Sequence, residues 1–244
     1  DVYKRQVLTQ AREKGISVIT LDADVEAGSR SIYISPVDAR ELGKELVREV
    51  DRICGHSGQW GILSAGSRSA NQNEWIYMMK QELQNLEYCG LRLVDIAYGE
   101  GEYEKAAEKA ELMLETYPDL KVMCCLSTEG IKAAADVVKA RGQASEVKVI
   151  GLGLPDQMEE YVGSDPEDVC PVLYIWSPMD LGRVAGYVCL ELSEGSIEDR
   201  ADQELLLGGR IYPVDYGQDG GLEVIAGEPI RVDAENIGYW KDQI

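Results

Sequence analysis

The sequence predicts an α/β fold in which parallel strands alternate with helices that cover both faces of a sheet. Short apolar runs of strand length recur along the chain, and segments with helical spacing of roughly 8–17 residues separate them. This alternation is typical of βαβ units, because a parallel strand pair needs a long crossover connection. From Ser193 onward the composition changes, with many Gly, Asp and Glu residues and only short strand-like pieces.

The predicted elements follow one another in a regular order. The predicted strands are 16–22, 32–35, 59–65, 91–98, 121–127, 147–153, 170–176, 209–214, 222–227 and 229–232. The predicted helices are 6–15, 38–53, 71–87, 103–117, 128–141, 155–162 and 178–192. We therefore expect seven helices interleaved with the first seven strands, and a short β-rich tail.

Local signals mark the helix ends. Asp38 is placed to cap the second predicted helix, at residues 38–53. Pro118 ends the predicted helix at residues 103–117. Gly15 and Gly142 are typical C-terminal caps. The second helix has the clearest apolar face, formed at helical spacing by Leu42, Leu46, Val50 and Ile53.

Composition excludes several classes of protein. The 244 residues suffice for one large domain or two smaller lobes, and no run of about 18 apolar residues predicts a membrane span. The 44 acidic and 24 basic residues give a net charge of −20, which opposes nucleic-acid binding. The six cysteines form no C-x-x-C pair and His56 is the only histidine, so we expect no zinc site and predict that the cysteines pack as small apolar residues.

The residues that follow the predicted strands are the candidate ligand site, since ligands of such sheets lie beyond the carboxyl ends of the strands. These positions are 22–24, 66–68, 98–100, 127–129, 153–155 and 176–178. Most of their polar side chains are uncharged or acidic, Arg68 is basic, and a Tyr and a Trp are among them. The set favours a neutral ligand that carries several hydroxyl groups.

Asp22 and Asp24 raise four possibilities: a metal site, a catalytic pair, a ligand clamp or a solvated turn. No second carboxylate has a clear catalytic role, and no G-x-S-x-G elbow or complete nucleotide-binding glycine loop is present. A magnesium site built from Asp22, Asp24 and Glu129 stays open at this point. Otherwise we expect no cofactor, no metal and no enzymatic activity.

Several long segments have a common resemblance. The segments are 15–35, with GISVITLDADVEAGSRSIYIS, then 69–75, 117–135, 149–162, 174–188 and 227–240. They resemble, in the same order, the sugar-type class I periplasmic binding proteins of ABC transporters, most closely the autoinducer-2-binding and rhamnose-binding branch. The resemblance implies two Rossmann-like lobes with parallel sheets, three crossing strands and a ligand cleft.

The resemblance also implies domain boundaries. Residues 1–55 and 178–244 are expected to form a discontinuous first lobe, and residues 56–177 the second lobe. The opening strand and helix of the family have no counterpart here, so we expect the first lobe to be truncated at its N-terminus. The first six residues, DVYKRQ, resemble translated adaptor sequence and are excluded from fold reasoning.

Ligand-binding residues are implied position by position. Asp22 matches the aspartate of the first lobe, Gln72 matches the family glutamine, and Asn71 replaces an aspartate. Leu126 and Thr128 replace a Pro and an Ala of the autoinducer-binding members, which puts that ligand in doubt. The remaining expected contacts are Ser127, Trp176 and Asp180.

Three positions have competing interpretations. Asn71 can simply cap its helix, as Ser127 can. Asp24 either contributes to the site, orders the turn or pairs with Arg30.

The sequence therefore predicts the substrate-binding subunit of an ABC importer that captures a rhamnose-like or autoinducer-2-like sugar. Its expected partners are the sugar and the permease subunits, and its expected location is periplasmic or extracellular, either free or held by a lipid anchor. The alternative is the effector-binding domain of a sugar-responsive transcription regulator. No nucleic-acid partner is expected, and the membrane is approached only through the transporter or an anchor.

Overall fold

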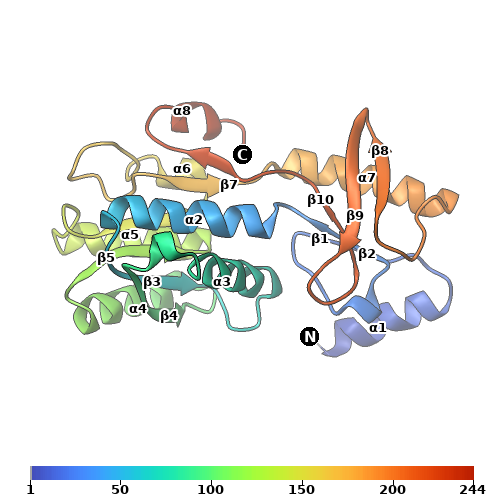
Figure 1. Ribbon diagram of the computed structural model, residues 1–244, viewed down its shortest axis with the longest axis horizontal. Helices are drawn as coiled ribbons and strands as arrows, with labels where there is room; N and C mark the ends of the chain where they lie inside the picture. The colour runs from blue at the N-terminus through green and yellow to red at the C-terminus, as the bar shows by residue number, and fades with distance from the viewer. Residues whose placement is uncertain (1) are drawn as a thin grey trace. The chain divides into compact units, whose positions relative to one another are not determined.

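The computed structural model describes residues 2–244 and divides the chain into two compact units (Figure 1). Unit 1 contains the residues up to Asp38 together with Trp176–Glu228, and unit 2 contains Ala39–Ile175 and Pro229–Ile244. The chain thus passes between the units three times. Each unit has its own sheet and its own apolar core.

Unit 2 is built on a six-stranded sheet with the order β11-β7-β6-β5-β3-β4. The strands are β3 (Gly58–Ser64), β4 (Leu91–Tyr98), β5 (Leu120–Cys125), β6 (Lys148–Leu152), β7 (Leu173–Ile175) and β11 (Ile230–Val232). All neighbours pair in parallel except β11, which is antiparallel to β7. The parallel alternation that the sequence predicts is confirmed here.

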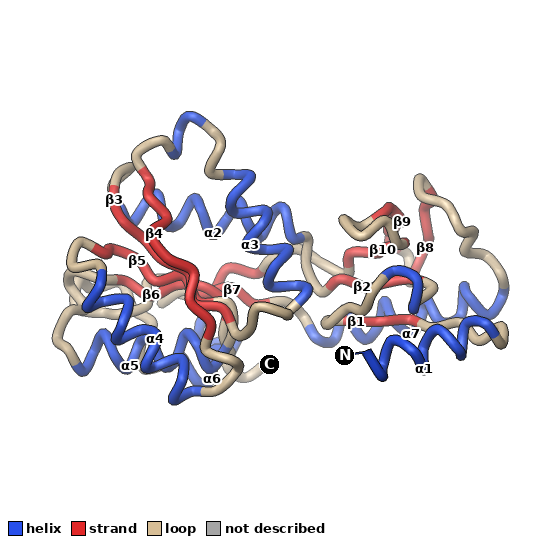
Figure 2. Tube along the Cα trace, turned by 90° about the horizontal axis from the view of Figure 1, so that it is seen from below, coloured by secondary structure: helices blue, strands red, loops and turns tan. Residues whose placement is uncertain are grey.

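Helices cover both faces of this sheet (Figure 2). One face carries α2 (Ala39–Cys54) and α3 (Ala70–Glu82), and the other carries α4 (Tyr103–Thr116), α5 (Thr128–Ala140) and the short α6 (Pro155–Met158). The predicted apolar face of α2 is buried at Leu42, Leu46 and Val50. The C-terminal segment adds α8 (Ile237–Trp240), and a 3-10 turn, η2 (Leu86–Tyr88), follows α3.

A close approach fixes the centre of the unit 2 sheet. Gly151 on β6 has φ 135°, and a Cβ at this position would lie 1.8 Å from the Cys125 carbonyl oxygen of β5. Only glycine fits this backbone. The neighbouring thiols of Cys124 and Cys125 are fully buried, and burial raises the pKa of Cys124 to about 12.

Unit 1 contains a five-stranded mixed sheet with the order β1-β2-β10-β9-β8. Its strands are β1 (Ile19–Leu21), β2 (Ile32–Ser35), β8 (Gln203–Leu207), β9 (Arg210–Tyr216) and β10 (Leu222–Ile225). The first three in spatial order are parallel, and β9 and β8 add an antiparallel hairpin. Helix α7 (Pro178–Glu194) packs on β1 and β2, while α1 (Val2–Glu13) contacts the 3-10 turn η1 (Ala27–Ser29).

The structure differs from the sequence prediction at several elements. Strand β8 was not predicted, although Gly208 and Gly209, with φ 57° and 85°, form the tight turn that joins it to β9. Helix α3 ends at Glu82 rather than at residue 87, which lies in the separate turn η2. Cys89 and Cys189 are exposed, so burial of the cysteines is confirmed only for Cys54, Cys124, Cys125 and Cys170.

The unit boundaries also differ from the predicted lobes. Helix α2 and residues 229–244 lie in unit 2, whereas the sequence analysis placed residues 1–55 and 178–244 together. The physical reason is packing, because α2 contacts α3 and β5, and β11 forms its ladder with β7. Trp176 and Ser177 correspondingly lie in unit 1.

Candidate functional site

Asp22 is the first residue beyond β1 and has an uncommon backbone. Its φ is 62°, in the left-handed region that few non-glycine residues occupy. The Asp22 N–H donates to the Ile34 carbonyl at 3.3 Å, and the Tyr33 hydroxyl donates to the Asp22 carbonyl at 2.8 Å. The backbone of Asp22 is therefore held on both sides by strand β2.

The carboxyl group of Asp22, unlike its backbone, has a buried oxygen without a hydrogen-bond donor. Its Oδ1 is buried and no described group donates a hydrogen bond to it. Burial raises the pKa of this carboxyl above its ordinary value of 3.8. A buried acceptor without a partner is costly. Among the described side chains, Asp51 Oδ1 and Trp60 Nε1 are likewise buried without a partner.

Asp24 has its hydrogen bonds within unit 1. Its Oδ1 accepts from the Thr20 hydroxyl at 2.6 Å and from Arg30 Nε at 2.6 Å. The pairing of Asp24 with Arg30 that the sequence suggested as one alternative is confirmed. Asp24 thus orders the turn that carries Asp22.

Gln72 and Asn71 lie in the first turn of α3, beyond the carboxyl end of β3. Gln72 is buried, and its Oε1 accepts from the Ser64 hydroxyl at 2.7 Å and from the Ala65 N–H at 2.8 Å. This places the Gln72 amide firmly against the end of the strand and leaves its Nε2 as a donor. Asn71 Oδ1 accepts from the Ser69 hydroxyl at 2.8 Å and from the Gln72 N–H at 2.9 Å, so its carboxamide oxygen has a local capping role.

The next strand end in unit 2 carries Ser127 and Thr128. Ser127 is the N-cap of α5, and its Oγ accepts from the Gly130 N–H at 3.1 Å. Thr128 is the first residue of α5 and is half-buried. Since β5 is the direct neighbour of β3, Thr128 and Gln72 follow adjacent strands at the same edge of the sheet.

Trp176 and Asp180 lie at the start of the chain's return to unit 1. Ser177 caps α7 and accepts from the Asp180 N–H at 3.1 Å, while Asp180 Oδ1 accepts from Arg183 at 2.5 Å. Helix α7 packs on β1, the strand that directly precedes Asp22. Trp176 is half-buried.

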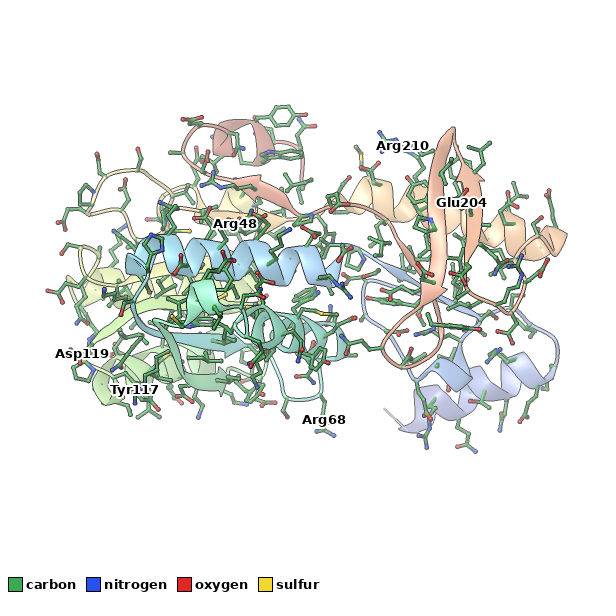
Figure 3. All side chains as sticks on the ribbon, in the orientation of Figure 1. Arg48, Arg68, Tyr117, Asp119, Glu204 and Arg210 are labelled. Atoms are coloured by element: carbon green, nitrogen blue, oxygen red, sulfur yellow. The ribbon has the colours of Figure 1, made fainter. Side chains whose placement is uncertain are left out.

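The structure therefore gathers the predicted residues in two sets. Asp22 and Asp24, with Trp176 and Asp180, belong to unit 1, whereas Asn71, Gln72, Ser127 and Thr128 belong to unit 2. Arg68 lies in the loop between β3 and α3, close in sequence to Gln72, but its exposed side chain points away from the ribbon (Figure 3). Sequence reasoning missed Asp219, which pairs with Arg30 at 2.9 Å.

Two further properties concern the part of the chain that the structure describes. No group of three or more His, Cys, Asp or Glu side chains there is arranged to hold a metal ion. None of its helices combines the length and the apolar character that a membrane crossing requires.

Comparison with known proteins identifies the family. The family described as periplasmic binding protein domain matches residues 4–197. A solved structure of an ABC transporter solute-binding protein from Clostridium phytofermentas, with bound L-rhamnose, is 35% identical. The match covers 98% of this chain and 76% of that chain, with a TM-score of 0.91.

More distant relatives agree in fold. LsrB from Clostridium saccharobutylicum in complex with AI-2 has a TM-score of 0.81 over 96% of this chain and 77% of that chain, at 17% identity. The D-ribose/D-allose-binding protein of Pseudomonas aeruginosa is 25% identical over 157 residues, which are 59% of this chain and 46% of that protein. The aligned part thus spans about half the length of this curated relative.

The α/β architecture and the sequence matches agree with one another. The chain belongs to the periplasmic binding protein family, and it is a member of the sugar-type solute-binding proteins of ABC transporters.

Proposed function

We propose that the protein captures a neutral sugar, of the rhamnose-like class, and delivers it to an ABC importer. The observation that carries this proposal is Asp22, whose buried Oδ1 lacks a donor in a chain of the periplasmic binding protein family. A sugar hydroxyl would supply this donor. The 35% identity to a protein that holds L-rhamnose supports this ligand class.

Each unit carries its own set of residues that we propose to contact a sugar. Asp22 accepts from ligand hydroxyls, Gln72 donates through Nε2, and Thr128 supplies a hydroxyl. Trp176 offers an apolar surface to the sugar ring, and Asp180 accepts a further hydroxyl. Asn71, Ser127 and Asp24 hold these residues in place, as their hydrogen bonds support.

This proposal is for binding without turnover, with the permease subunits as partners and a periplasmic or extracellular location. Isothermal titration calorimetry with L-rhamnose, D-ribose and D-arabinose tests the binding, and mass spectrometry of the recovered sugar tests the absence of chemistry. We expect saturable binding of at least one sugar, recovered unchanged. Chemical conversion of the sugar would contradict the proposal.

The transport role needs its own experiment. The membrane subunits of a candidate sugar ABC importer are reconstituted in vesicles, and uptake of the sugar is measured with and without the protein. We expect uptake only when the protein is present. Sugar-dependent binding to DNA would instead favour the regulator, which the net charge of −20 opposes.

A further inference from the structure

We infer that Arg30 is a positioning residue for sugar binding, because it locks the turn that carries Asp22 to the distant turn between β9 and β10. We call Arg30, Asp24 and Asp219 the Arg30 node. The inference rests on the proposed function, since it gives the node a role in the binding site of unit 1.

Every nitrogen of the Arg30 guanidinium has a partner. Nε donates to Asp24 Oδ1 at 2.6 Å, and Nη2 donates to both carboxylate oxygens of Asp219 at 2.9 and 3.0 Å. Nη1 donates to the Leu222 carbonyl at 3.0 Å. Arg30 is only 2% exposed, so these bonds lie in a poorly solvated place.

A buried guanidinium requires this arrangement. Its transfer from water is unfavourable unless charges and hydrogen bonds compensate it, and here two carboxylates and a carbonyl do so. The planar guanidinium directs three nitrogens to three different partners, namely Nε to Asp24, Nη1 to the Leu222 carbonyl and Nη2 to Asp219, and the single nitrogen of a lysine ammonium cannot reproduce this set. The node therefore fixes orientation as well as charge.

The node connects directly to the Asp22 turn. Asp24 Oδ1 also accepts from the Thr20 hydroxyl at 2.6 Å. Because Thr20 lies in β1, this hydrogen bond connects the turn that follows Asp22 back to that strand. The guanidinium lies 5.5 Å from the centre of the Tyr33 ring, whose hydroxyl donates to the Asp22 carbonyl. The Asp22 carbonyl is thus held by Tyr33, which contacts Arg30, and Asp24, two residues further along the turn, is bonded to Arg30 itself.

Such support is what a strained residue needs. A non-glycine residue in the left-handed region costs free energy and persists where its surroundings over-determine it. Asp22 combines this backbone with a buried carboxyl oxygen that lacks a donor. Without the node, the turn could relax and expose the carboxyl to water.

The far side of the node is also shaped for this contact. Asp219 lies 189 residues from Arg30 in the sequence and occupies the turn between β9 and β10. A Cβ on Gly221 would lie 2.4 Å from Arg30 Nη1 and 2.8 Å from the Ala27 Cβ. Glycine at this position lets the two turns approach closely.

The test compares Arg30→Lys and Asp219→Asn with the control Glu26→Gln. Glu26 lies in the same turn but forms only an exposed ion pair with Arg5 at 2.8 Å. For each variant we measure the affinity for L-rhamnose by calorimetry, the Tm, and the pKa of Asp22 by carboxyl NMR without ligand. The NMR measurement needs no ligand, so it separates this inference from the proposed function.

The expected result is specific to the node. Arg30→Lys should weaken L-rhamnose binding by about tenfold or more, since small displacements of a binding group are costly. The pKa of Asp22 should fall toward its ordinary value as the carboxyl gains water, and Asp219→Asn should give the same changes to a smaller extent. Glu26→Gln should change neither quantity.

Two results would overturn the inference. In the first, Arg30→Lys folds and leaves both the affinity and the Asp22 pKa unchanged. If Arg30→Lys does not fold, Asp219→Asn decides, and an unchanged Asp22 pKa in that variant overturns it. If the unaltered protein binds no sugar, the proposed function fails while the NMR comparison still decides the role of Arg30.

Discussion

Replacing Asp22 by Asn removes the charge of the proposed ligand clamp and keeps its shape. The left-handed backbone, with φ 62°, is tolerated by Asn better than by most residues, so the variant should fold. A hydrogen bond to a charged group contributes about 1.5–3 kcal/mol, and each 1.4 kcal/mol changes affinity about tenfold. The affinity for the bound sugar should therefore fall by roughly 10- to 150-fold.

Stability should respond in the opposite direction. In the unliganded protein, the Asp22 Oδ1 is buried without a donor and burial raises the pKa of the carboxyl. The neutral amide avoids the desolvation of a charge, so Asp22→Asn should keep or raise the Tm. A binding site that costs stability is a common arrangement in functional proteins.

The assay is calorimetry with L-rhamnose combined with thermal unfolding, and Asp202→Asn is the matched control. Asp202 is an exposed aspartate of unit 1 that also has a left-handed backbone, with φ 59°. The control should leave affinity and Tm unchanged. An Asp22→Asn variant that binds with the affinity of the unaltered protein would refute the reasoning.

Three further predictions concern stability. Ser127→Ala should lower the free energy of unfolding by about 0.5–2 kcal/mol in chemical denaturation, since Ser127 caps α5; an unchanged value would contradict this. Gly151→Ala should prevent folding, because a Cβ would lie 1.8 Å from the Cys125 carbonyl oxygen. The control Gly186→Ala in α7 meets no atom within 4 Å and should fold. Circular dichroism spectra that are the same for the two variants would contradict this. Burial raises the pKa of Asp22 above 3.8, so the unfolded chain loses that proton first as pH rises. The free energy of unfolding, relative to Asp22→Asn, should therefore fall as pH rises from 3.8 to the folded pKa and stay constant above it, and a constant difference throughout would contradict this.

The sequence was informative where structure depends on local pattern. The alternation of apolar runs and helical spacing predicted the sheet of unit 2, and parallel strand ends predicted which residues share an edge. Ser127 at the N-terminus of α5 followed from capping chemistry alone. These features depend on residues that are close together in the chain.

The missed features depend on distant residues or on packing. The Arg30–Asp219 pair joins positions 189 residues apart, and no local spacing reveals such a pair. The predicted lobe boundaries differ from the unit boundaries, because the contact of α2 with α3 and the ladder of β11 with β7 place these elements in unit 2. Strand β8 has the sequence QELLL, in which burial alternates but polarity does not, so the Gly208-Gly209 pair that follows was the available hairpin signal.

The central claim is that the protein binds a neutral sugar through Asp22, and a thermal-shift titration tests it most directly. A ligand present at 100 times its Kd stabilises a protein by about 2.7 kcal/mol, and each kcal/mol raises the Tm by about 2–4 °C at this size. L-Rhamnose or a related neutral sugar should therefore raise the Tm by roughly 5–10 °C, and by clearly less in Asp22→Asn. No shift with any neutral sugar, or an equal shift in both proteins, would contradict the account.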